Sequence, residues 1–121
     1  ITIALRQAAK ELGMKSHTGV VQCKDSFYGQ HDPDSMPVGY ELKDKWQAWI
    51  KAGCLASEME SAAVFIVSQI LGMRAGCVLN VLWNQERRKQ GLSDRESQDM
   101  TAALDVSVGA IRELILADRE K

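Results

Sequence analysis

The sequence predicts an α/β protein in which a mixed β-sheet is flanked by layers of helices. Two observations predict this class. Stretches with apolar residues at helical spacing alternate with short runs of consecutive apolar residues, and a glycine follows most of the helical stretches. A third observation is an acidic segment, residues 57–61 (SEMES), where an apolar run gives way to a helical stretch. Ligands of α/β proteins gather where strands end and helices begin, so this corner is the first candidate site.

Length and composition describe an ordinary globular domain. The 121 residues are enough for one domain with a real core, and 45% of them are hydrophobic and 26% charged. The net charge of −1, with scattered basic residues, is unlike that of a nucleic-acid-binding protein. No apolar run approaches the roughly 20 residues that span a bilayer, so no membrane contact is expected. No signal peptide is recognisable, and the first residue is not Met, as in a chain that begins inside a longer protein.

The cysteines and the absence of common motifs limit the kinds of functional site that the sequence predicts. Cys23, Cys54 and Cys77 lie among strand-like apolar residues without the spacing of metal ligands. Structural thiols in a reducing compartment explain them, so we expect a cytoplasmic protein without a metal site. The sequence also has no glycine-rich phosphate loop and no serine in a nucleophile-elbow setting.

Four helices are expected from apolar residues that recur every three or four positions. They cover residues 1–12, 40–52, about 59–71 and about 97–117. Glycines at positions 13, 53 and 72 end the first three. The expected apolar face of the last helix consists of Met100, Ala103, Leu104, Val108, Ile111, Leu114 and Ile115.

Three short strands are expected where apolar residues follow one another, at 18–21, 54–56 and 76–83. The last is almost continuously apolar and should be buried on both faces. Residues 25–39 contain both prolines and predict a long irregular loop, whose aromatic residues favour function over disorder. The charged segment 84–91 predicts a solvated turn or helix.

The acidic corner admits a structural explanation as well as a functional one. Ser57 could cap the following helix together with Glu60 three residues later, as in a capping box. Met59 would then begin the apolar stripe of that helix. This explanation leaves the second acid, Glu58, without a role.

Three motifs together resemble the uridine-cleaving members of the nucleoside phosphorylase family. They are residues 25–30 (DSFYGQ), 57–63 (SEMESAA) and 84–87 (NQER). The family has a trimeric or hexameric α/β fold. The resemblance implies that residues 1–121 form a single partial domain, the C-terminal half of a phosphorylase domain. It also implies that the phosphate site lies in the other half.

The implied activity is the reversible phosphorolysis of uridine to uracil and ribose 1-phosphate, a step of pyrimidine salvage. Phosphate is then a co-substrate, no cofactor is expected, and the partners are copies of the chain, a hexamer in the family. By the resemblance, Glu60 accepts hydrogen bonds from the ribose 2′ and 3′ hydroxyls, with Glu58 nearby. Met59 packs under the sugar, although a place in the helix core suits Met59 equally well.

The resemblance assigns Gln30 to the uracil edge, because an amide can donate to a carbonyl while it accepts from N3–H. Phe27 packs against the base or, alternatively, in the core. Two departures affect base recognition, since Asp32 and Gln85 stand where the better-known members have arginine. Arg87 lies close enough in sequence to be a candidate base-loop residue, with solvation as its alternative state.

Two other functions stay open. A purine nucleoside phosphorylase or nucleoside hydrolase of the same fold protonates its base from an aspartate after the long strand. Asn84 stands there in this chain and cannot act as an acid at neutral pH. The other alternative is a non-catalytic fragment that binds nucleosides.

Overall fold

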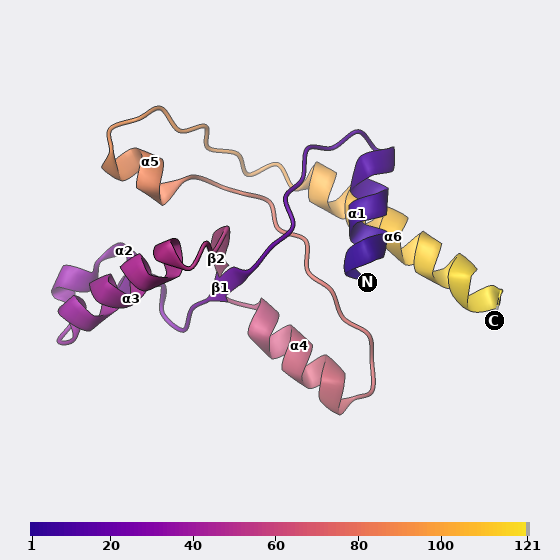
Figure 1. The fold of residues 1–121 in the computed structure, drawn as a ribbon, viewed down its shortest axis with the longest axis horizontal. Helices are drawn as coiled ribbons and strands as arrows, with labels where there is room; N and C mark the ends of the chain where they lie inside the picture. The colour runs from indigo at the N-terminus through magenta and orange to yellow at the C-terminus, as the bar shows by residue number, and fades with distance from the viewer. Residues whose placement is uncertain (121) are drawn as a thin grey trace. The chain divides into compact units, whose positions relative to one another are not determined.

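The computed structural model describes residues 1–120, which form two compact units (Figure 1). One unit comprises residues 18–75, and the other comprises 1–17 together with 76 onward. A small parallel sheet flanked by helices confirms the α/β class.

The sheet of the first unit has two parallel strands, β1 (Val21–Cys23) and β2 (Ala56–Glu58). Val21 lies opposite Ala56, and Cys23 lies opposite Glu58. Parallel strands need a long crossover, and here it carries α2 (Phe27–His31), the 3-10 helix η1 (Pro33–Ser35) and α3 (Gly39–Lys51). Helix α4 (Ser61–Ile70) follows β2, so the acidic segment lies at the carboxyl end of a strand.

Both strands exist where the sequence predicted strands, but each begins two or three residues later. The pairing decides this, because Leu55 N donates to Val20 O at 2.9 Å and Lys24 N donates to Glu58 O at 2.9 Å. The strand therefore reaches Glu58, and helix α4 begins at Ser61, the last residue of the acidic segment, and not at Met59.

The segment 25–39 is not the irregular loop that its prolines suggested. Ser26 caps α2, with its Oγ accepting from Gly29 N at 3.0 Å, and Pro33 begins η1. Gly29 is buried, and α2 packs against α3. These local caps give the segment a regular backbone that the composition alone did not reveal.

The second unit is held by α1 (Thr2–Glu11) and α6 (Thr101–Arg119), which pack against each other. Its core is made of small side chains, and the buried residues are Ala4, Ala8, Ala9, Val106 and Ala110. A Cβ atom built on Gly109 would lie 3.1 Å from Ala8 Cβ, so the two helices approach closely there. The charged segment forms a short helix, α5 (Gln85–Lys89), as one of its two predicted forms.

The predicted apolar face of α6 is confirmed at Leu114, which packs against the core, but it is wrong for most of its larger residues. Val106 and Ala110 are buried, whereas Leu104 is 61% exposed and Ile111 56% exposed. Small residues let the backbones of α1 and α6 come close, so the helix packs through its alanine and glycine side. The larger apolar side chains of the predicted face, such as Leu104 and Ile111, stay at the surface of this unit.

The predicted strand at 76–83 is also wrong for the described residues, which form no ladder there. Val81 is 65% exposed. The recorded bonds of the segment include Asn80 Nδ2 to Ser97 O at 3.1 Å and Ser97 N to Leu82 O at 3.0 Å. A buried strand needs neighbours on both edges, and residues 1–120 do not supply them.

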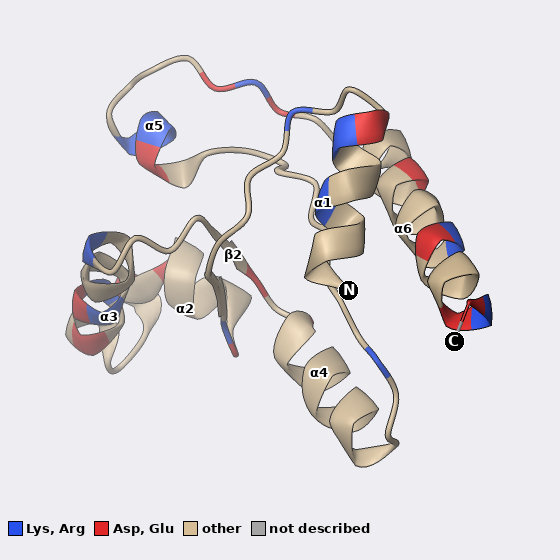
Figure 2. Ribbon diagram, turned by 45° about the vertical axis from the view of Figure 1, so that its right-hand side comes forward, with Lys and Arg blue, Asp and Glu red and all other residues tan. Residues whose placement is uncertain are grey.

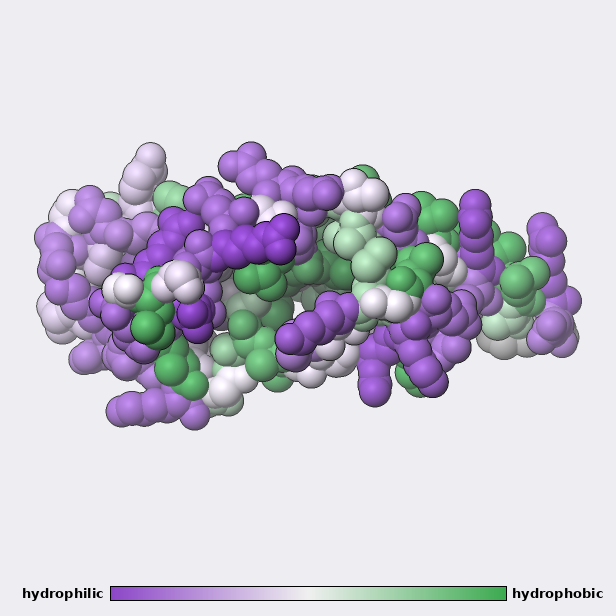
Figure 3. Space-filling model, turned by 90° about the horizontal axis from the view of Figure 1, so that it is seen from above, coloured by the Kyte–Doolittle hydropathy of each residue, from purple (hydrophilic) through white to green (hydrophobic). Residues whose placement is uncertain are grey.

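Apolar side chains reach the surface in both units. Figure 2 shows α4 free of charged residues, and Ile66 and Ile70 of this helix are 61% and 77% exposed. Hydrophobic residues, green in Figure 3, are visible between the polar ones on the face shown. Within residues 1–120, no helix has the length and apolarity that crossing a membrane requires.

Candidate functional site at the acidic corner

Five of the predicted substrate residues lie in the unit of residues 18–75: Phe27, Gln30, Glu58, Met59 and Glu60. Glu58 is the last residue of β2, and Glu60 is the N-cap of α4. Gln30 lies in α2 and is joined to β2 by a hydrogen bond. The fold thus brings the 25–30 and 57–61 motifs together, although 27 residues separate Gln30 from Ser57.

Glu58 supports the start of helix α4. Its Oε2 accepts from Glu60 N at 2.8 Å and from Ser61 N at 2.7 Å, and its Oε1 accepts from Ser61 Oγ at 2.6 Å. Amide groups of a first helical turn lack intrahelical partners, so this carboxylate satisfies them. The predicted capping box is wrong, because Ser57 lies inside β2 and Glu58 supplies the cap.

These hydrogen bonds determine the charge state of Glu58. Burial raises its pKa, but hydrogen bonds from Ser61, from the Cys23 thiol and from the Glu60 amide outweigh burial and lower the pKa from 4.5 to about 2. Glu58 is therefore a carboxylate at neutral pH, and both of its oxygens are engaged within the protein.

Glu60 is in a different state. Its side chain is exposed, and its Oε2 accepts from Met59 N at 3.2 Å. Within the described part of the chain, no hydrogen bond to its Oε1 is recorded. Of the two acids, Glu60 is the one with acceptor capacity for an external diol.

Gln30 is held through a chain of side chains that starts at Lys24. Lys24 Nζ donates to Ser57 Oγ at 3.2 Å, and Ser57 Oγ donates to Gln30 Oε1 at 2.8 Å. Partial burial lowers the pKa of Lys24, while the charges of Glu58 and Glu60 oppose that shift. Sequence reasoning did not assign a site role to Lys24 or Ser57, although Ser57 begins the 57–63 motif and Lys24 directly precedes the 25–30 motif.

Phe27 and Met59 are not in the core. Phe27 is 42% exposed and Met59 37% exposed. The Phe27 ring lies 5.5 Å from Tyr28 in an edge-on arrangement and 4.2 Å from His31, centroid to centroid. Both side chains can therefore contact a ligand, and the core alternative does not describe either of them.

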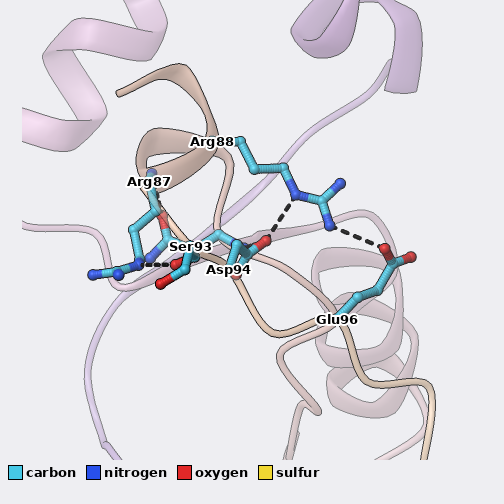
Figure 4. A network of polar contacts seen from close by, with 6 residues as sticks. Arg87, Arg88, Ser93, Asp94 and Glu96 are labelled. Atoms are coloured by element: carbon cyan, nitrogen blue, oxygen red, sulfur yellow. Dashed lines mark hydrogen bonds and ion pairs between the residues drawn. The ribbon is translucent and has the colours of Figure 1, made fainter. Parts of the chain in front are cut away.

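Arg87 belongs to the other unit, in a polar network of its own (Figure 4). Its Nε donates to Ser93 O at 2.8 Å, and Asn84 Oδ1 accepts from Arg87 N at 3.0 Å, which caps α5. The neighbouring Arg88 pairs with Asp94 at 2.8 Å and with Glu96 at 3.0 Å. The network gives Arg87 and Asn84 local structural roles.

Among the described residues, no cluster of three or more His, Cys, Asp or Glu residues is arranged to hold a metal ion.

Comparisons with known proteins point to one family. The phosphorylase superfamily model matches residues 1–115. The chain is 50% identical over 118 residues to the uridine phosphorylase of Treponema pallidum, covering 98% of this chain and 46% of that protein. It is 33% identical over 117 residues to the uridine phosphorylase of Escherichia coli, covering 94% and 46%. A DeoD-type purine nucleoside phosphorylase of Clostridium beijerinckii is 34% identical over 73 residues, covering 60% and 26%. The chain spans about half the length of the uridine phosphorylases that it matches.

Proposed function

This chain belongs to the phosphorylase superfamily, and from that premise we propose that it is the nucleoside-binding part of a uridine phosphorylase. The reaction is the reversible phosphorolysis of uridine to uracil and ribose 1-phosphate. The observation that carries the proposal is the 50% identity to the Treponema pallidum uridine phosphorylase over 98% of this chain. We take the chain to be the C-terminal half of one phosphorylase domain, because it spans 46% of that relative.

Ribose binding falls to Glu60 in this proposal. An exposed carboxylate with acceptor capacity can take hydrogen bonds from two vicinal hydroxyls. As the glycosidic bond breaks, positive charge develops on the sugar, and a nearby negative charge stabilises it. Glu58 acts indirectly by fixing the backbone amides of Glu60 and Ser61. Met59 offers an apolar contact for the ring.

Base recognition falls to Gln30 and Phe27. An amide can donate to a uracil carbonyl and accept from N3–H, and its N–H stabilises charge on the departing base. A purine-cleaving alternative rests on the Clostridium beijerinckii relative. It is disfavoured because Asn84 cannot protonate a purine and serves as the cap of α5. Arg87 remains a candidate base-loop residue in the assembled enzyme.

Phosphate binding is assigned to the remainder of the domain. A phosphate site needs several donors that converge on one spot. In this chain Arg88 is already paired with Asp94 and Glu96, and no glycine-rich loop precedes a helix. Phosphate serves as co-substrate, and the chemistry needs no cofactor.

The proposed function also implies an oligomeric state and a cellular location. We assign the enzyme to pyrimidine salvage in the cytoplasm, in keeping with the free thiols Cys23, Cys54 and Cys77. Exposed apolar residues on α4 support association between copies, and the family expectation is a hexamer.

The test is uracil release from uridine, followed by absorbance with and without phosphate. The 121-residue chain alone should show no phosphate-dependent release. The chain joined to the N-terminal part of the Treponema pallidum uridine phosphorylase, here called the completed enzyme, should release uracil and cleave uridine far faster than inosine. Equal rates on uridine and inosine would contradict the pyrimidine assignment. Binding of uridine without any turnover would support the non-catalytic alternative.

A further inference from the structure

We infer that Ser57, oriented by Lys24, locks the amide of Gln30 in one of its two orientations and so selects a base with an imide N–H. The selected class is uridine and other nucleosides with that edge, and cytidine is rejected. The inference rests on the proposed function, because it names a specificity device for the same site. Ser57 and Lys24 are positioning residues here, acting through Gln30.

The lock follows from donor and acceptor chemistry. A serine hydroxyl carries one proton, and Lys24 Nζ approaches the acceptor side of Ser57 Oγ at 3.2 Å. The proton of Ser57 is directed to Gln30, whose Oε1 lies 2.8 Å away. Rotating the amide by half a turn would make Ser57 Oγ accept from Nε2 as well as from Lys24, and the hydroxyl proton would lose Oε1 as its acceptor. The arrangement therefore favours a carbonyl oxygen toward Ser57, and Nε2 points away from it.

Three features make the lock rigid. Ser57 lies in strand β2 and is partly buried, so its backbone is fixed by the ladder. Gln30 lies in α2, whose first turn is capped by Ser26. Lys24 is also partly buried and directly follows β1, which pairs with β2. Each member of the chain is thus held by a different element of one unit.

A locked amide distinguishes pyrimidine bases by their edges. Uracil presents N3–H beside a carbonyl oxygen, which matches an amide oxygen beside an amide N–H. Gln30 Oε1 can accept this second bond because a carbonyl oxygen has two lone pairs. Cytosine presents a bare N3 where uracil has N–H, so the same orientation sets acceptor against acceptor. A freely rotating glutamine could turn over and accommodate cytosine, whereas a locked one leaves the polar groups unpaired.

The experiment measures kcat/KM for uridine and cytidine in the completed enzyme. Ser57→Ala removes the proton donor and should lower the uridine-to-cytidine ratio about fivefold or more. Ser57→Thr keeps a hydroxyl and should keep the ratio within about twofold of the parent. Lys24→Met removes the group that orients Ser57 and should give an intermediate ratio. A ratio that stays unchanged in Ser57→Ala overturns the inference.

Ser26→Ala is the matched control. It removes another serine hydroxyl near Gln30, the one that accepts from Gly29 N at 3.0 Å. Because it loosens α2 without touching the amide orientation, it should lower both rate constants in proportion and leave the ratio unchanged. A ratio change equal to that of Ser57→Ala would assign the effect to general loosening and reject the lock.

A second measurement separates this inference from the proposed function. In a ¹⁵N-edited NOE spectrum of the 121-residue chain, the Gln30 amide protons should show only weak contacts with the Ser57 β protons. Strong contacts would show the opposite orientation and overturn the lock, whatever the activity. A completed enzyme that does not act on uridine would refute the proposed function, while the spectrum would still decide the orientation of Gln30.

Discussion

The acidic corner and the apolar segment 76–83 show two ways in which a sequence pattern can relate to structure. At the corner, polar partners lie within a few residues or on the paired strand, and the structure satisfies them. In the segment 76–83, the pattern fits a strand buried on both faces, yet Val81 is 65% exposed. The difference shows that local hydrogen bonds form from the chain itself, whereas a sheet interior depends on neighbouring strands.

The largest expected effect concerns the unsatisfied apolar surface. At micromolar concentration the 121-residue chain should associate with itself or with the proposed N-terminal half, because Ile70 is 77% exposed and Val81 65% exposed. Ile70→Asp and Val81→Asp should shift the population toward monomer. Light scattering measures the change, and Gln47→Glu, which adds one negative charge at an exposed polar position, is a control on charge alone. A parent chain that is a clean monomer with cooperative unfolding would contradict this prediction.

The next effect concerns the exposed acid of the corner. Glu60→Gln keeps the shape of the side chain but removes its charge, so kcat/KM for uridine in the completed enzyme should fall at least about tenfold, roughly 1.4 kcal/mol of transition-state stabilisation. Steady-state kinetics measures the loss. Glu41→Gln, an exposed acid in the first turn of α3, is a matched control and should leave the rate unchanged. An unchanged kcat/KM in Glu60→Gln would show that Glu60 serves only as the N-cap of α4.

The engaged acid of the corner should act on stability and on its pH dependence. The folded pKa of Glu58, about 2, lies below its ordinary value of 4.5. Its contribution is therefore fully present above about pH 4.5 and is lost as the pH falls toward 2. Glu58→Gln should cost about 1 kcal/mol at pH 7 and flatten the decline of stability between these pH values. Urea unfolding followed by circular dichroism at pH 7, 4 and 3 measures this. If the free energy of unfolding falls equally at low pH in the parent and in Glu58→Gln, Glu58 does not cause the acid destabilisation.

The smallest effect concerns the cap of α2. Ser26→Ala should lower the free energy of unfolding by about 0.5 kcal/mol, the low end for an N-cap loss, because α2 has only five residues. Ser26→Asp keeps an acceptor for Gly29 N and should restore the loss. The measurement is again urea unfolding, at neutral pH. If Ser26→Ala and Ser26→Asp prove equally stable, the cap contributes nothing.

The sequence by itself determined the features that depend on local backbone and local composition. Gly13, Gly53 and Gly72 have φ of 65°, 79° and 65°, and each ends a helix where the pattern predicted an end. Left-handed backbone is inexpensive only for glycine, so a single residue carries that information. The α/β class and the site motifs were likewise recognisable in the printed residues, although the roles of those site residues remain a proposal.

The tertiary structure decided what each pattern packs against and which polar group meets which partner. The face of α6 was settled by close approach to α1 through Ala8 and Gly109, which the larger residues of the helix could not indicate. The strand register placed Glu58 beside Cys23, so that Glu58 and not Ser57 caps α4. Ser57 was thereby left to hold Gln30. These outcomes depend on contacts between residues far apart in the chain. A shift of the strand register by one residue would turn every side chain of the strand to the opposite face of the sheet.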